Sequence, residues 1–89
     1  MSDIERSAVV ALDTRGLICP MPVIRTQDRV KTLPAGAVLE ILSSDRGALH
    51  DIPAWCRVHG HEVLETQQHD REVRIRVRVH RRDEPAASA

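Results

Sequence analysis

The sequence predicts an α/β fold: a two-layer α/β sandwich with the element order βαβαββ, in which two helices cover one face of a four-stranded mixed sheet. Three patterns predict it: short apolar runs rich in β-branched residues, two segments with apolar residues at helical spacing, and one long alternating segment. A chain of 89 residues is one domain. We expect this domain to span residues 8–80, with flexible termini at 1–7 and 81–89.

The first three elements are predicted between residues 8 and 42. Residues 8–12 form a short apolar run with two valines at its centre, which predicts a buried strand ending at the turn residues 13–16. A helix is predicted over 20–33, because its apolar residues share one half of a helical wheel. These residues are Val23, Ile24, Thr26, Val30 and Leu33. Residues 37–42 predict a second strand, apolar enough for a central position.

The last three elements are predicted between residues 46 and 80. Oxygen-bearing side chains at 43–45 can cap a helical turn at 46–49, and Pro53 either opens the main helix or kinks it. One stripe of that helix holds Leu49, Ile52, Cys56 and His59, and Gly60 is suited to end it. Residues 61–68 predict a weaker strand. Residues 71–80 alternate strictly, with three valines and one isoleucine on one face and mainly arginines on the other.

Composition and charge limit the classes of function. Basic residues number 13 and acidic residues 13, so the formal net charge is zero with neutral histidines. Trp55 is the only aromatic residue, which excludes the multi-aromatic base-stacking surface of RRM and OB modules. No apolar run is long enough to cross a bilayer, and the N-terminus lacks the pattern of a secretory signal. We therefore expect a cytoplasmic protein without membrane contact.

Cys19 is the residue that we expect to carry chemistry. It lies where a loop meets the first predicted helix, and Pro20 is favoured at the first position of a helix. Free backbone N–H groups and the positive end of the helix dipole favour a thiolate there. Arg15 and Arg25 add positive charge, while Pro20 and Pro22 stiffen the segment. The alternative is a buried structural cysteine, since this residue type usually serves as a small hydrophobe.

The surroundings of Cys19 in the sequence favour group transfer over redox chemistry. No second cysteine lies beside it, so it is not part of a Cys-x-x-Cys redox pair. No histidine or acid is placed by the sequence to form a catalytic pair with it, although the fold could bring one into contact. A solitary thiol of this kind suits a task in which it accepts a group, carries it and gives it away.

Cys56 is predicted to be a buried structural thiol, because it lies on the apolar stripe of the second helix. Two cysteines are too few for a disulfide scaffold, so free thiols are expected. The side chains that could be read as metal ligands are Cys56, His59, His61 and His50. Their spacing matches no strong zinc pattern, and His61 lies beyond the predicted helix. We expect no metal site.

Arg74, Arg76 and Arg78 form an arginine ladder on the last predicted strand, with side chains about 6.6–6.8 Å apart along one face. Residues 71–82 hold six arginines and one acid, so the rest of the chain is acidic. The ladder is either the solvated face of an amphipathic strand or a docking patch for a phosphate backbone or an acidic protein. A non-catalytic nucleic-acid-binding or protein-binding regulatory module is therefore the alternative function.

The segment Leu12-Asp13-x-x-Gly16-Leu17-x-Cys19-Pro20-x-Pro22 resembles the TusA family of sulfur-carrier proteins, also called SirA-like. The resemblance continues through Asp45, residues 51–55 and residues 60–63, and covers roughly residues 10–79. It implies a βαβαββ two-layer fold and a persulfide carried covalently on Cys19, with no other cofactor. It makes Gly16, Pro20 and Pro22 part of the motif that positions the thiol. Around the sulfur or its partner we expect Asp13, Arg15, Met21 and Arg25.

The resemblance also implies partner proteins. Members of the family take sulfane sulfur from a cysteine desulfurase or a rhodanese and pass it to a downstream acceptor protein. The outlets are tRNA 2-thiouridine formation, sulfur oxidation and molybdenum cofactor maturation, and the sequence does not choose among them. At Gln27 and Asp28 the chain departs from many members, which carry basic residues there. We expect a sulfurtransferase-type carrier that needs partner enzymes for turnover.

Overall fold

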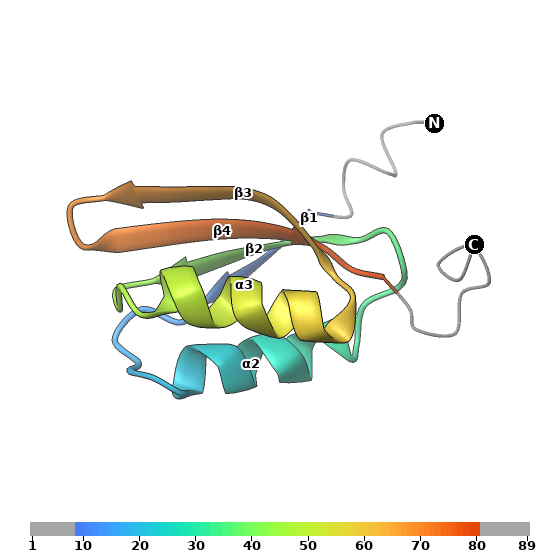
Figure 1. The fold of residues 1–89 in the computed structure, drawn as a ribbon, viewed down its shortest axis with the longest axis horizontal. Coiled ribbons are helices and arrows are strands. Elements are labelled where there is room, and N and C mark those ends of the chain that lie inside the picture. The colour runs from blue at the N-terminus through green and yellow to red at the C-terminus, as the bar shows by residue number, and fades with distance from the viewer. Residues whose placement is uncertain (1–8, 81–89) are drawn as a thin grey trace.

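The computed structural model describes residues 9–80, and the termini predicted to be flexible, 1–7 and 81–89, lie outside this range. The elements are β1 (Val9–Asp13), α2 (Met21–Val30), β2 (Val38–Ser43), α3 (Ala48–His59), β3 (Glu62–His69) and β4 (Glu72–Arg78). Figure 1 shows two layers, with both helices on the same face of the sheet. The predicted two-layer sandwich and its βαβαββ order are therefore confirmed.

The sheet is mixed, as predicted, and its strand order is β1-β2-β4-β3. β1 and β2 are parallel, so α2 is the crossover connection between them, while β4 pairs antiparallel with both β2 and β3. The last strand in the sequence thus lies inside the sheet. Its alternation has the predicted meaning, because Val73, Ile75 and Val77 are fully buried and the arginines between them are exposed.

The core fills the space between the helices and the sheet. Its buried apolar members are Val30, Leu33, Ala37, Leu39, Ile41, Ala48, Ile52, Cys56, Val73, Ile75, Val77 and Val79. α3 is one continuous helix, and Pro53 lies inside it rather than at its start. Gly60 ends this helix in a left-handed conformation at φ 82°, as its position predicted. Within residues 9–80, no helix has the length and apolar character needed to cross a membrane.

The first helix differs from its prediction in length and in the face that it buries. It begins at Met21 and ends at Val30, whereas the sequence predicted a helix over 20–33. Its buried residues are Pro22, Thr26 and Val30, a stripe at four-residue spacing. Thr26 can be buried because its hydroxyl donates a hydrogen bond to the Pro22 carbonyl. Ile24, two residues from both Pro22 and Thr26, is consequently turned outward and is 41% exposed.

Candidate functional site

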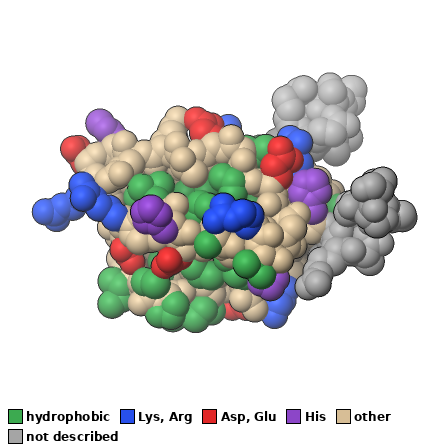
Figure 2. Space-filling view, viewed as in Figure 1, with side chains coloured by type: hydrophobic (Ala, Val, Ile, Leu, Met, Phe, Trp, Pro, Cys, Tyr) green, Lys and Arg blue, Asp and Glu red, His purple; other side chains and the backbone are tan. Residues whose placement is uncertain are grey.

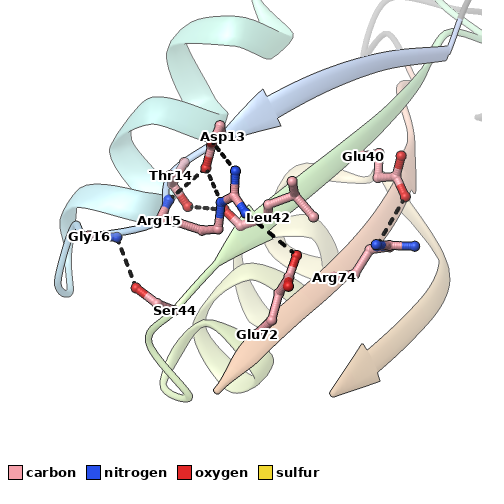
Figure 3. A network of polar contacts seen from close by, with 9 residues as sticks. All are labelled: Asp13, Thr14, Arg15, Gly16, Glu40, Leu42, Ser44, Glu72 and Arg74. Atoms are coloured by element: carbon pink, nitrogen blue, oxygen red, sulfur yellow. Dashed lines mark hydrogen bonds and ion pairs between the residues drawn. The ribbon is translucent and has the colours of Figure 1, made fainter. Parts of the chain in front are cut away.

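The loop between β1 and α2 is fastened to the end of β2. Thr14 is fully buried, and both its backbone N–H and its hydroxyl donate to the Leu42 carbonyl oxygen. Gly16 has a positive φ of 87°, which favours glycine, and its N–H donates to Ser44 Oγ at 2.8 Å. Figure 3 shows these contacts joining the loop to the strand beside it. The loop therefore carries Cys19 across the carboxyl ends of the parallel strands β1 and β2.

Two carboxylates from elsewhere in the chain hold Cys19. The Cys19 side chain is exposed, and its Sγ donates a hydrogen bond to Asp51 Oδ2 at 2.8 Å. Its backbone N–H donates to Asp45 Oδ2 at 2.9 Å. Asp45 lies in the loop between β2 and α3, and Asp51 lies in the first turn of α3. The thiol thus lies where three segments of the chain meet.

These carboxylates reverse the predicted state of the thiol. The hydrogen bond to Asp51 is the main cause that raises the pKa of Cys19 above its ordinary value, followed by partial desolvation and by the charges of Asp51 and Asp45. The prediction of a low-pKa thiolate is therefore wrong. The predicted position is confirmed, because Pro20 is the N-cap residue of α2 and Cys19 lies next to it, but the two carboxylates outweigh the effect of the helix end. The Cys19 sulfur is a protonated hydrogen-bond donor in this arrangement.

The arginines expected to favour a thiolate act elsewhere. Arg15 donates to Asp13 through Nε at 2.9 Å and Nη2 at 2.8 Å, and its Nη1 lies 3.9 Å from Glu72 Oε2. Figure 3 shows the Arg15 guanidinium turned toward these two acids. The Arg25 side chain is exposed on α2 and makes no ion pair or hydrogen bond within residues 9–80. Neither side chain is therefore paired with Cys19 or with the carboxylates beside it.

The remaining predicted site residues occupy the start of α2. Pro20 is the N-cap residue, Pro22 is buried and Met21 is half-buried as the first residue of the helix. Gly16 shapes the loop, as described above. The structure thus gathers the motif residues around the loop and helix junction, while the direct contacts of Cys19 are made by Asp45 and Asp51.

The Asp13–Arg15 pair should be detectable in an NMR titration. Hydrogen bonds from the Arg15 side chain and backbone lower the pKa of Asp13 to about 2. We expect the Asp13 carboxyl signal to titrate near this value, so that the pair is intact at neutral pH and is lost only as the pH falls through about 2. In Arg15→Gln the midpoint should rise toward 3.8. An unchanged midpoint would show that the side-chain pair does not form.

Two exposed isoleucines lie in the segments next to the cysteine. Ile18, next to Cys19, is 73% exposed, and Ile24 on α2 is also exposed. Figure 2 shows hydrophobic side chains gathered on the side of the molecule formed by α2. Among the exposed large hydrophobic residues within residues 9–80, these two are the ones nearest to Cys19 in the sequence.

Cys56 is fully buried in the core, as the sequence predicted, and both cysteines are free. Burial raises the pKa of the Cys56 thiol to about 11. His59 and His61 lie against Trp55, with ring centroids 4.8 and 5.1 Å away. With His80 these residues line a cavity of about 250 Å³ formed near the carboxyl ends of α2 and α3. Within residues 9–80, no three His, Cys, Asp or Glu side chains are grouped to hold a metal ion.

The two cysteines can be separated by replacing Cys56 with serine. A hydroxyl at this buried position has no partner prepared for it, so the free energy of unfolding should fall by about 1–3 kcal/mol. The rate at which iodoacetamide alkylates Cys19 should stay at the wild-type value. Urea denaturation and intact mass measure the two quantities. A loss of Cys19 alkylation at full stability would contradict the structural role of Cys56.

The arginine ladder is largely neutralised within the sheet. Glu40 on β2 lies 3.3 Å from Arg74 and 3.6 Å from Arg76, and Glu62 on β3 lies 3.9 Å from Arg78. Figure 3 shows Arg74 extended across the sheet to Glu40. A phosphate backbone would have to compete with these carboxylates for the guanidinium groups. The contacts therefore favour the solvated face of an amphipathic strand over a docking patch.

Sequence reasoning missed the pairing of Asp51 with Cys19. The two residues are 32 positions apart, and only the packing of α3 beside the loop brings them together. A signal was present, because Asp45 and the segment beginning at Asp51 belong to the second block of resemblance. That block indicates the family, but the sequence alone does not show that its aspartates contact the thiol.

Comparison with known proteins connects this site to a family. The family model described as Sulfurtransferase TusA matches residues 10–79. The sulfur carrier protein TusA of Pseudomonas putida GB-1 is 40% identical over 68 residues, which cover 76% of this chain and 82% of that protein. YrkF of Bacillus subtilis is 48% identical over 60 residues, which cover 67% of this chain but only 32% of YrkF.

A solved structure supports the same architecture. The SirA-like protein of Desulfitobacterium hafniense superposes with a TM-score of 0.70 over 81% of this chain and 99% of its own. Its sequence identity to this chain is 20%, so this likeness concerns the fold.

Proposed function

Because the chain belongs to the TusA family of sulfur carriers, we propose that it accepts sulfane sulfur as a persulfide on Cys19 and transfers it to a downstream acceptor protein. The observation that carries this proposal is the exposed, hydrogen-bonded thiol of Cys19, set on a loop that is fastened to the sheet. The other cysteine of the chain is fully buried in the core. A sulfur-bearing group must reach two different proteins in turn, and the exposure of Cys19 meets this need.

The transfer needs no resident cofactor on the carrier. In loading, the Cys19 sulfur attacks the terminal sulfur of a donor persulfide, a new S–S bond forms at Sγ, and the donor leaves as a thiol. In unloading, an acceptor thiol attacks the terminal sulfur, and Cys19 returns to the thiol. Each exchange oxidises one thiol to a persulfide while it reduces the other persulfide to a thiol, so no external oxidant is required.

Partner proteins supply the chemistry that the carrier lacks. We propose a cysteine desulfurase or a rhodanese as the donor and a protein thiol as the acceptor. The exposed Ile18 and Ile24 offer an apolar contact surface close to the start of α2, where such a partner would dock. The outlet is tRNA 2-thiouridine formation, sulfur oxidation or cofactor maturation, and the chain alone is expected to show little turnover.

The proposal is tested by loading the reduced protein with a cysteine desulfurase and free cysteine. We expect the intact mass to rise by the mass of one sulfur atom, and the added mass to be removed by a reductant. Peptide mapping should assign the added sulfur to the peptide that holds Cys19. A protein that gains no sulfur from the desulfurase or from a rhodanese, or that gains it on Cys56, would overturn the proposal.

A further inference from the structure

The contact between Cys19 and Asp51 places a carboxylate directly on the sulfur that exchanges. Asp51 Oδ2 lies 2.8 Å from Sγ, and Asp51 is half-buried at the start of α3, where the helix dipole favours its negative charge. Asp45 adds a second carboxylate through the Cys19 backbone N–H. None of the nearby basic side chains is paired with these carboxylates. Arg15 is engaged by Asp13, and the exposed side chains of Arg25, Arg46 and His50 make no ion pair or hydrogen bond within residues 9–80.

We propose that Asp51 sets the direction of sulfur exchange at Cys19, by restraining the empty thiol as a nucleophile and by preserving the loaded persulfide as an electrophile. This inference rests on the proposed function. Both effects follow from one charge, because a carboxylate at this distance disfavours a second negative charge on either form of the sulfur.

In the empty carrier, Asp51 accepts a hydrogen bond from the Cys19 thiol, which keeps its proton. The thiolate is the nucleophilic form of cysteine, so holding the proton on Sγ lowers the rate at which Cys19 reacts with alkylating agents or stray disulfides. Loading by a donor persulfide therefore requires that the Cys19 thiol break its hydrogen bond to Asp51 and lose its proton.

In the loaded carrier, the same carboxylate acts on the persulfide. A neutral persulfide is attacked by an acceptor thiolate more readily than a persulfide anion, which repels the incoming charge. The acceptor forms a bond to the terminal sulfur, the Sγ–S bond breaks, and Sγ leaves with the electron pair. The acceptor is oxidised from thiol to persulfide and Cys19 is reduced to the thiol. The persulfide proton stays on the transferred sulfur, and the leaving Sγ thiolate takes up a proton from solvent, which restores the hydrogen bond to Asp51.

The test compares Asp51→Asn with the wild type in two reactions of opposite direction. For the empty protein, we expect iodoacetamide to alkylate Cys19 roughly three- to fourfold faster at neutral pH for each pKa unit by which the thiol becomes more acidic, because the thiolate fraction rises about tenfold while its intrinsic nucleophilicity falls; the pH profile should be displaced to lower pH. For protein loaded with inorganic polysulfide, we expect sulfur release to dithiothreitol to be slower than in the wild type. A change that only loosened the fold would accelerate both reactions.

Three further variants separate the effect of the Asp51 charge from general effects of substitution. Asp28→Asn removes one carboxylate from the exposed part of α2 and should leave both rates unchanged, and Asp51→Glu keeps the charge and should retain a profile close to that of the wild type. Asp45→Asn should shift both reactions in the same directions as Asp51→Asn but by less, and it replaces that variant if Asp51→Asn does not fold. Coincident alkylation profiles, or release that is unchanged or faster, would overturn the inference. The alkylation measurement is made on the empty protein and needs no sulfur loading. It therefore tests the effect of Asp51 even if the wild type cannot be loaded.

Discussion

Replacement of Cys19 by serine is expected to reduce sulfur loading to the background of a reaction without donor enzyme. The serine hydroxyl can keep the hydrogen bond to Asp51, so the loop and the fold should be preserved. The hydroxyl is nevertheless a far weaker nucleophile than a thiol at neutral pH and does not form a persulfide. Incubation with a cysteine desulfurase and cysteine, followed by intact mass, measures the loss.

The matched control for this variant is Cys56→Ser. Because Cys56 is fully buried, its replacement should leave loading at the wild-type level, although the protein unfolds more easily. Circular dichroism and urea denaturation of Cys19→Ser should give wild-type curves, which assigns the loss to the chemistry of the sulfur. Sulfur that is still added to a folded Cys19→Ser protein would show that another residue carries it.

Replacement of Ile75 by alanine is expected to give the largest loss of stability among the substitutions considered. Ile75 lies on β4, the strand between β2 and β3, and its side chain is fully buried against the helices. Truncation of a buried isoleucine costs about 2–5 kcal/mol, a large share of the roughly 5–15 kcal/mol that stabilises a whole domain. Thermal unfolding should show a Tm lower by about 10 °C or more.

The control makes the same chemical change on the surface. Ile18 is 73% exposed, so Ile18→Ala should change the free energy of unfolding by less than about 0.5 kcal/mol. The same substitution at two sites separates burial from residue type. Equal losses of stability in the two variants would contradict the packing of the sheet against the helices. Since Ile18 adjoins Cys19, its replacement should instead weaken loading by the donor protein.

The parts of this protein that could be predicted from its sequence are those set by local patterns. Alternation over residues 71–80 identified the strand that holds Ile75, and Gly60 marked the end of α3, because each depends on the conformation of neighbouring residues. The loop that presents Cys19 could be predicted from turn residues and prolines in the same way. The sequence predicted the buried face of α2 less accurately than these features. A helical wheel does not show which arc faces the sheet, and Ile24 lies outside the buried stripe.

What the sequence alone determined was therefore the order of the elements, the buried role of Cys56 and the choice of Cys19 as the exposed thiol. The tertiary structure decided the chemical state of that thiol. Helix position and nearby arginines predicted a thiolate, but Asp51, 32 residues away, accepts a hydrogen bond from the thiol, and Asp45 accepts one from its backbone N–H. The tertiary structure also places Glu40 and Glu62 beside the arginine ladder, where their charges neutralise most of it. The physical reason is the same in both cases. Electrostatic effects depend on the distance between charges in space, and strand order and helix packing set that distance independently of separation along the chain.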